Sequence, residues 1–282
     1  MSIPRRVVAV IGSGGMGLAS ARRLAGGRRV LLADYSQRNL DFAAKSLRDD
    51  GHEVDTHIID IADFASVQTF AAAAATAGHI DAVVHTAGLS PAMATGQRIL
   101  EVDLLGTVHV IDAFADILPA GASLTCIASI ARFGLQPPPA LAAHLATAPR
   151  DQLLTGNKDL LDVDKLADPG AAYTLSKAGN LLRVQAATRA YAARGARINT
   201  ISPGVILTAM VREEMEGSSG DTIRGMIQSM PMGRGGAADE IAGAVAFLAG
   251  PDASYVTGSD IVVDGGFIAG SQALFWGKKP EV

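Results

Sequence analysis

Seven short apolar runs recur along this chain, and most are separated by a segment long enough to form a helix. The runs are VVAVI (7–11), RVLLA (29–33), VDTHII (54–59), IDAVVHT (80–86), SLTCIA (123–128), RINTIS (197–202) and DIVVD (260–264). Such runs are typical of strands buried on both faces of a sheet. Helical connections such as FASVQTFAAAAATAG make the strands parallel. The sequence therefore predicts an α/β fold with an open, doubly wound parallel sheet flanked by helices.

The alternation is interrupted once, at residues 135–169. This segment opens with three prolines and closes with another, and it is too long for a simple connection. We expect an insertion that carries one or two short helices. No internal repeat and no flexible linker divides the 282 residues. Residues 1–282 are therefore predicted to form a single domain.

Composition excludes several classes of function. A net charge of -4 and scattered arginines exclude a basic surface for nucleic acid. No apolar stretch reaches the length of a membrane span. Cys126 is the single cysteine, so no intrachain disulfide is possible, and we expect a cytoplasmic protein. The six histidines lack the spacing of metal ligands, and no metal site is predicted.

A glycine-rich turn follows the first apolar run. Gly12, Gly14 and Gly17 satisfy G-x-G-x-x-G directly before the helical pattern MGLASARRLA. In a dinucleotide site of Rossmann type, the first glycine makes the tight turn and the second lets backbone N–H groups approach the pyrophosphate. The third lets the helix pack closely on the strand. The motif predicts that a dinucleotide binds at this end of the sheet.

Two carboxylates stand at the ends of the next strands. Asp34 closes the second strand, where a carboxylate accepts from the adenosine ribose hydroxyls and repels a 2′-phosphate. It therefore favours NAD over NADP; the alternative is a residue of an ordinary helix N-cap. Asp60 ends the third strand in IIDIAD, where it can accept from the adenine amino group. A plain turn residue is the alternative for Asp60.

The stretch YTLSK places Tyr173 and Lys177 one helical turn apart on one face of a helix. A tyrosine with a pKa near 10 is a poor base at neutral pH. A lysine charge one turn away, together with a positive oxidised nicotinamide ring, favours the phenolate and makes proton transfer possible. A surface pair without function is the alternative.

Motifs in a defined order resemble those of the short-chain dehydrogenase/reductase family over nearly the whole chain. They are DIAD (60–63), HTAG (85–88), IAS (127–129), YTLSK (173–177), PGVILT (203–208) and GRGGAADEIAGAVAFLAGPDASYVTGSDIVVDGG. The resemblance implies hydride transfer between nicotinamide and a secondary alcohol or ketone. It implies Ser129, Tyr173 and Lys177 as catalytic residues, with Asp103 as a fourth member. It places the dinucleotide against Gly12, Gly14, Met16, Gly17, Asp34, Asp60, Ile61, Ala87, Gly88, Tyr173, Lys177, Pro203, Gly204, Ile206 and Thr208.

The chain departs from the family pattern at three places. The glycine loop is one residue shorter than usual, and Ile11 replaces a threonine. Asp103 in VDLLG stands where the family has an asparagine whose backbone carbonyl holds a water linked to the lysine; a helix-surface aspartate is the alternative. The Asp103 carboxylate would add charge near Lys177. His85 and Thr86 replace two asparagines of the family, and we interpret both as structural.

The substrate side is predicted from two further features. Residues 208–232 should form a lid, and five of the eight methionines lie there. Flexible thioethers suit a bulky apolar ligand, although they also suit simple packing of the lid. The insertion before Tyr173 resembles that of bacterial 3α-hydroxysteroid dehydrogenase/carbonyl reductases. These features favour a lipophilic, steroid-like ketone or alcohol.

Two alternative functions remain open. One is an NADPH-dependent 3-oxoacyl thioester reductase, against which Asp34 argues. The other is a non-catalytic dinucleotide sensor, against which the intact Ser129, Tyr173 and Lys177 argue. The family resemblance implies a homodimer or homotetramer, and Trp276 in the tail either docks on a neighbouring subunit or frays.

Overall fold

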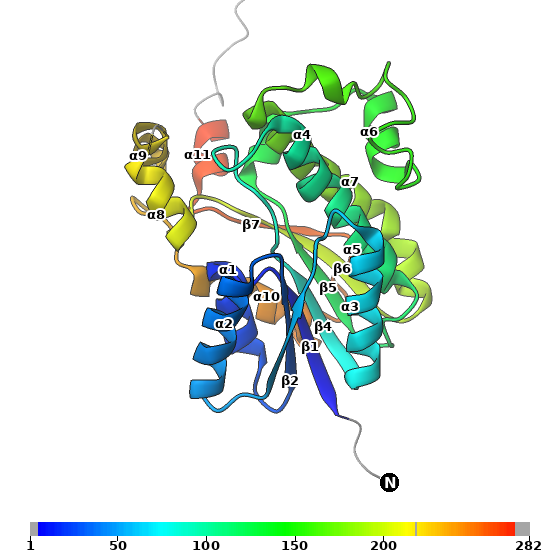
Figure 1. Ribbon diagram of the computed structural model, residues 1–282. Coiled ribbons are helices and arrows are strands. Elements are labelled where there is room, and N and C mark those ends of the chain that lie inside the picture. Colours follow the sequence, from blue (N-terminus) through cyan, green and yellow to red (C-terminus); the bar gives the residue numbers. More distant parts are fainter. Residues whose placement is uncertain (1–4, 218, 274–282) are drawn as a thin grey trace, which may run out of the picture.

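All seven apolar runs form strands. The structure, a computed structural model, describes residues 5–217 and 219–273. The strands are β1 (Arg6–Ile11), β2 (Arg29–Asp34), β3 (Val54–Ile58), β4 (His79–His85), β5 (Ser123–Ile127), β6 (Arg197–Pro203) and β7 (Asp260–Val263). Every neighbouring pair is parallel, in the order β3-β2-β1-β4-β5-β6-β7. The order reverses beside β1, so the predicted doubly wound sheet is confirmed (Figure 1). Trp276 lies outside the described residues.

The two edge strands depart from the predicted burial on both faces. β3 buries Val54, but its following side chains are half-buried or exposed. β7 has no fully buried side chain. Each strand pairs with one neighbour only, so less of the molecule covers it.

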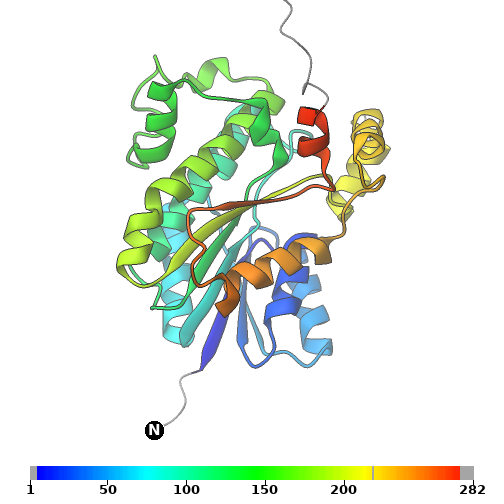
Figure 2. The same ribbon diagram turned by 180° about the vertical axis from the view of Figure 1, so that it is seen from behind.

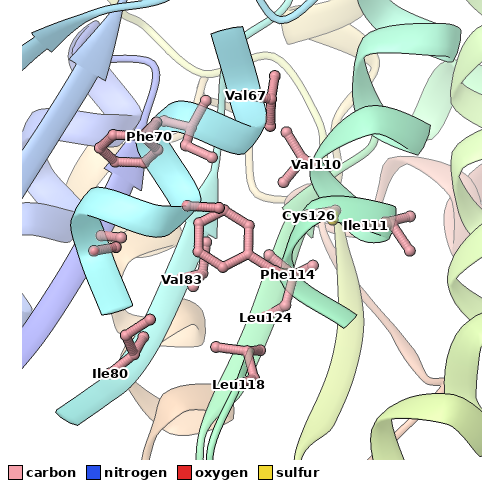
Figure 3. Packing of buried hydrophobic residues seen from close by; sticks show 14 of the residues in the cluster. Val67, Phe70, Ile80, Val83, Val110, Ile111, Phe114, Leu118, Leu124 and Cys126 are labelled. Atoms are coloured by element: carbon pink, nitrogen blue, oxygen red, sulfur yellow. The ribbon is translucent and has the colours of Figure 1, made fainter. Parts of the chain in front are cut away.

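Helices cover both faces of the sheet (Figures 1 and 2). One layer consists of α1 (Gly15–Leu24), α2 (Gln37–Asp49) and α10 (Ala238–Ala249), and the other of α3 (Phe64–Ala77), α5 (Gly106–Ala115) and α7 (Pro169–Ala193). Figure 3 shows Phe70, Phe114 and Cys126 in the second layer's core. Burial raises the pKa of the Cys126 thiol to about 12, so it stays protonated.

Helix α7 begins at a capped position that the sequence makes explicit. The Asp168 side chain accepts a hydrogen bond from the Ala171 N–H at 2.8 Å, and Pro169 occupies the first helical position. Both residue types favour a helix start, where backbone N–H groups lack partners. An aspartate accepts a hydrogen bond from one of these groups, and a proline has no N–H that would need a partner. The cap therefore sets where Tyr173 and Lys177 lie along the helix.

The remaining elements gather largely at the end of the molecule where the strands finish (Figure 1). They are α4 (Gly96–Ile99), the π-helix η1 (Leu100–Leu105), the 3-10 helices η2 (Ile130–Gly134), η3 (Val163–Lys165) and η4 (Pro251–Ala253), and α6 (Pro139–Thr147), α8 (Ala209–Glu216), α9 (Gly220–Ser229) and α11 (Phe267–Ala273). Segment 135–169 contains α6 and η3. Its Leu145, Leu153 and Leu161 pack on α7 and η1 in a third apolar cluster.

The described part of the chain has neither a membrane-spanning helix nor a cluster of metal ligands. No helix there is long and apolar enough to cross a membrane. Within residues 5–217 and 219–273, no group of three or more His, Cys, Asp or Glu side chains is placed to hold a metal ion.

Candidate active site

The glycine loop joins β1 to α1, and its glycines serve different needs. Gly12 has a φ of +93°, and a Cβ there would lie 2.5 Å from the Ala87 nitrogen. A Cβ on Gly17 would lie 1.8 Å from the Gly12 oxygen, so this position must stay glycine. A Cβ on Gly14 would meet open space instead. Gly14 precedes the first turn of α1, whose free N–H groups attract an anion.

The Asp34 carboxylate is fixed against this loop. Its Oδ2 accepts from the Ser13 backbone N–H at 2.7 Å and from the Ser13 hydroxyl at 2.9 Å. Its Oδ1 accepts from the Ser36 N–H at 2.8 Å. The side chain that caps α2 is that of Ser36, two residues after Asp34, so Asp34 itself is not the capping residue. The sequence analysis missed Ser13, which has no signal beyond its place in the loop.

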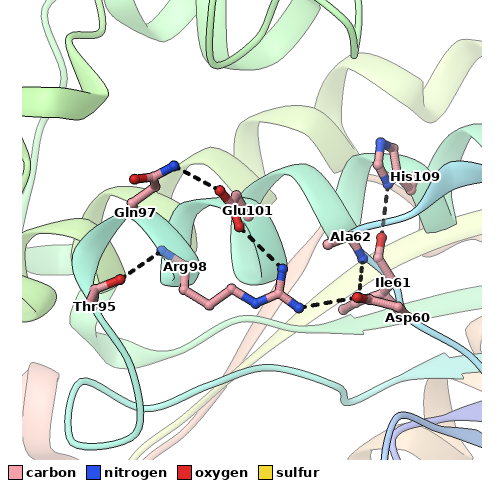
Figure 4. Close-up of polar contacts among 8 residues, drawn as sticks. All are labelled: Asp60, Ile61, Ala62, Thr95, Gln97, Arg98, Glu101 and His109. Carbon is pink, nitrogen blue, oxygen red and sulfur yellow. Dashed lines mark hydrogen bonds and ion pairs between the residues drawn. The ribbon is translucent and has the colours of Figure 1, made fainter.

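Asp60 lies at the end of β3, beside the end of β2, and is held on two sides (Figure 4). Its Oδ1 accepts from the Ala62 N–H at 2.9 Å. Its Oδ2 pairs with Arg98 at 3.2 Å, and Arg98 also pairs with Glu101 at 3.2 Å. The sequence analysis missed Arg98, because its distance from Asp60 along the chain hides the contact.

The next strand end is held by two structural side chains. The Thr86 hydroxyl donates to the Gly12 carbonyl at 2.8 Å, and the buried His85 ring lies 3.1 Å from the Thr107 hydroxyl. Burial and the nearby Lys177 charge lower the pKa of His85 to about 3. Both contacts agree with the structural interpretation of His85 and Thr86. The Ala87 N–H donates to the Ile11 carbonyl at 3.0 Å, which keeps Ala87 close to Gly12.

Ser129 lies at the carboxyl end of β5 and is half-buried. Its oxygen accepts from the Ala131 N–H at 3.1 Å, which caps η2. One lone pair of the hydroxyl is thereby engaged, while its hydrogen is free to be donated. Helix α7, which carries Tyr173, packs against η2.

Tyr173 and Lys177 lie on the same face of α7. The Lys177 Nζ atom is 5.0 Å from the centre of the Tyr173 ring. Lys177 is buried, whereas Tyr173 is half-buried and accessible to a ligand. A buried ammonium this close attracts the phenolate more strongly than the neutral phenol. The geometry therefore permits the acid–base chemistry expected of this pair.

Asp103 is not a helix-surface residue; this alternative is wrong. It lies in the π-helix η1, and its side chain is wholly buried. Its Oδ2 is 2.9 Å from Lys177 Nζ, and its Oδ1 accepts from the Leu89 N–H at 2.7 Å. Burial by itself lowers the pKa of Lys177, but the attraction of Asp103 and Tyr173 outweighs burial and raises it. The added charge expected near Lys177 is present.

The segment after β6 passes over the glycine loop. Pro203 ends β6, and the Thr208 N–H donates to the Ile206 carbonyl at 2.7 Å. The Thr208 hydroxyl caps α8, and a Cβ on Gly15 would lie 2.8 Å from its methyl group. Thr208 therefore packs directly on the loop.

Other predicted cofactor residues lie around the same strand ends. A Cβ on Gly88 would lie 3.1 Å from the Asp103 Oδ2 and 3.3 Å from the Lys177 Nζ. Gly204 packs on Asp264. Met16 packs against the core beneath α1, and the Ile61 side chain is buried.

Segment 208–232, which is predicted to form a lid, contacts the chain that follows β4. The Ser90 hydroxyl, after β4, hydrogen-bonds to the Glu214 carboxylate on α8. This contact was not predicted. The methionines of this segment differ in exposure: Met230 is buried, whereas Met210 and Met232 are exposed. Packing explains Met230, and the exposed pair stays available to a ligand.

Known proteins resemble the chain over most of its length. A family profile described as "short chain dehydrogenase" matches residues 6–147, and one described as "Enoyl-(Acyl carrier protein) reductase" matches residues 161–268. The short-chain dehydrogenase/reductase bsc3 of Alternaria brassicicola is 40% identical over 92% of this chain and 94% of that protein. The cis-4-hydroxycyclohexanecarboxylate dehydrogenase of Sinomonas cyclohexanicum is 32% identical over 94% and 97%.

A solved structure shares the fold over most of the chain. The crystal structure of levodione reductase superposes with a TM-score of 0.74 and 26% identity over 94% of this chain and 98% of that one. The two family profiles and the two relatives together cover nearly all of the chain. The chain therefore belongs to the short-chain dehydrogenase/reductase family.

Proposed function

We propose that this oxidoreductase uses NAD(H) to interconvert a secondary alcohol and a ketone, with Tyr173 as the acid–base group. The observation that carries the proposal is the buried Lys177 ammonium, 5.0 Å from the Tyr173 ring on one face of α7. A structural surface pair would not bury its ammonium with a carboxylate.

The residues present fit a dinucleotide. Gly14 faces open space at the amino end of α1, which suits a pyrophosphate. Asp34 and Asp60 supply oxygen acceptors at neighbouring strand ends. When bound, NAD(H) accepts or supplies the hydride. We assign Thr208 and the Ile206 backbone to the carboxamide side, and Lys177 to the nicotinamide ribose as well.

Ser129 and Tyr173 act on the substrate oxygen. Because its oxygen already accepts from Ala131, the Ser129 hydroxyl donates its hydrogen to the carbonyl oxygen of a ketone. Tyr173 donates its phenolic proton to the same oxygen during reduction and takes it back during oxidation. Lys177 stabilises the phenolate left behind. Asp103 keeps Lys177 protonated and offsets part of its charge.

We assign the preference for NAD to Asp34. A 2′-phosphate would approach a carboxylate that two serines already hold in place, so like charges would repel at short range. The same preference argues against the NADPH-dependent thioester reductase.

We propose a lipophilic substrate under the α8 and α9 lid. The exposed Met210 and Met232 support an apolar lining, and one relative is named for an alicyclic hydroxy acid. The insertion's likeness to that of the bacterial 3α-hydroxysteroid dehydrogenases stays a prediction. The test is a panel of steroids, aryl ketones, cyclic alcohols and polyols, followed by NADH absorbance. Turnover of small polyols without turnover of lipophilic ketones contradicts the substrate class. NADH binding without turnover of any compound would support the sensor instead.

We also propose the domain organisation, the assembly and the location of the protein. We infer one dinucleotide-binding domain over residues 1–282, working as a homodimer or homotetramer in the cytoplasm, where the buried Cys126 stays reduced. Light scattering on the purified protein tests the assembly, because a monomer at every concentration contradicts it.

A further inference from the structure

A cavity of about 510 Å³ opens between the inserted segment and the helices α4, η1 and α5. None of the residues assigned above to catalysis or to the dinucleotide lines it. Its volume lies in the range of small-molecule sites, which is about 300 to 1,000 Å³. Its wall includes Glu101, which pairs with Arg98. It also includes His109, whose ring contacts the Ile61 carbonyl after the end of β3.

His109 lines this cavity. The residue is only 5% exposed, and its Nδ1 lies 2.8 Å from the Ile61 carbonyl oxygen. A carbonyl only accepts, so Nδ1 carries the hydrogen and Nε2 is an unprotonated acceptor. Nε2 hydrogen-bonds to no residue in the described part of the chain, and it points away from Ile61 (Figure 4). Burial lowers the pKa of His109, which keeps the ring neutral.

The cations of the cavity wall already have partners. The Arg150 guanidinium lies 3.7 Å from the centre of the Phe64 ring and 3.6 Å from the Asp112 carboxylate. Lys158 pairs with Asp164 at 2.9 Å. The Asp151 carboxylate, in contrast, is exposed and forms no ion pair within residues 5–217 and 219–273. His109 Nε2 and the Asp151 carboxylate are therefore the acceptors that an occupant of the cavity can reach with hydrogen-bond donors.

Three apolar side chains complete the wall, together with Gln97 and Thr155. Leu105, Leu154 and Val163 are half-buried and line the cavity from η1 and from the inserted segment. An occupant that covers them gains the free energy of burying apolar surface. Hydroxyl groups on an aliphatic or alicyclic body match this combination of acceptors and apolar side chains.

We propose that this cavity is a second small-molecule site, and that it binds a neutral alcohol whose hydroxyl donates to His109 Nε2. The body of the alcohol packs on Leu105, Leu154 and Val163, and a second hydroxyl reaches Asp151. The site is separate from the catalytic residues, so it does not depend on the proposed reaction.

The test uses cis-1,4-cyclohexanediol with the full chain saturated by NADH, so that the diol cannot be oxidised. Calorimetry gives its affinity, and a crystal soak gives its position. We expect the diol in the cavity with an oxygen within hydrogen-bonding distance of Nε2. The dimethyl ether of the diol, which accepts but cannot donate, should bind at least about tenfold more weakly. Diol found only beside Ser129, or no binding, overturns the proposal.

Two substitutions at His109 separate its ring nitrogens. His109→Asn keeps a donor near the position of Nδ1 and removes Nε2, and it should weaken diol binding about tenfold. His109→Gln places an amide nearer Nε2 and should bind more tightly than the Asn variant. Leu154→Trp fills the cavity from a half-buried position and should abolish binding. Unchanged affinity in His109→Asn or in Leu154→Trp, with melting curves like the parent protein, contradicts the site.

Discussion

The Lys177 ammonium and the Asp103 carboxylate form an ion pair from which water is almost excluded. Lys177 Nζ lies 2.9 Å from Asp103 Oδ2, and the side chains of Lys177 and Asp103 are 7% and 0% exposed. In such surroundings a charge pair interacts strongly, and losing one partner leaves the other costly to bury. Lys177 lies one helical turn from Tyr173 on α7, so the charges of the pair act on the proposed acid–base group.

The first prediction concerns the charge of Asp103. Asp103→Asn removes the carboxylate that keeps the buried Lys177 protonated, so the pKa of Lys177 should fall and Tyr173 should lose its neighbouring cation at high pH. We expect the alkaline limb of the pH profile for alcohol oxidation to move to lower pH. The profile of kcat/KM for any accepted alcohol measures this. If Asp103 were only structural, the variant would lose stability without any shift of the limb.

The second prediction tests Tyr173 directly. Tyr173→Phe keeps the ring and removes the phenolic proton, so kcat should fall by roughly 10² to 10⁴. NADH affinity, followed by its fluorescence, should stay nearly unchanged, because the aromatic ring still packs against the third apolar cluster and Lys177 is kept. Substantial turnover in this variant would mean that another group moves the proton.

The third prediction concerns the choice of dinucleotide. Asp34→Ala removes the ribose acceptor and the charge that repels a 2′-phosphate, so NADH should bind roughly tenfold more weakly and the preference over NADPH should shrink. Ser13→Ala is the matched control, since it removes one hydrogen bond to Asp34 and keeps the carboxylate. Equal effects of both substitutions would point to a disturbed loop rather than to lost discrimination.

The fourth prediction concerns Arg98, which holds Asp60 from α4. Arg98→Ala should weaken NADH binding roughly fivefold, about 1 kcal/mol, because Asp60 loses a fixed partner. Reduced nicotinamide mononucleotide, which lacks adenosine, should bind both proteins alike. A similar loss for both ligands would place the effect of Arg98 away from the adenine end.

The fifth prediction concerns stability in acid. The pKa of His85 is about 3 in the folded protein, below its value near 6.5 when unfolded. The unfolded chain therefore binds the proton first, and the contribution of His85 is full above pH 6.5 and is lost as pH falls toward 3. His85→Asn should remove about 1.4 kcal/mol per pH unit from this dependence. Urea unfolding at several pH values, compared with the parent protein, measures the difference; identical slopes contradict the assignment.

Much of the fold follows from local pattern. Apolar runs of strand length, separated by helical segments, led to all seven strands and to the parallel sheet. Burial of the two edge strands was overestimated, because an apolar run does not state how many neighbours its strand will have. The insertion was visible as prolines in sequence, yet the cavity it closes was not.

The candidate site also contains residues that local sequence predicted and contacts that it did not. The positive φ of Gly12, the approach of Gly17 to the Gly12 oxygen and the Asp168 cap involve atoms close in the sequence, so these residue types alone determined the glycine loop and the start of α7. The partners Arg98 for Asp60 and Lys177 for Asp103 come from distant segments, and only the packed structure decided them. The physical reason is range: backbone conformation depends on neighbouring residues, whereas the charge around a buried group depends on whatever the fold brings within a few ångströms.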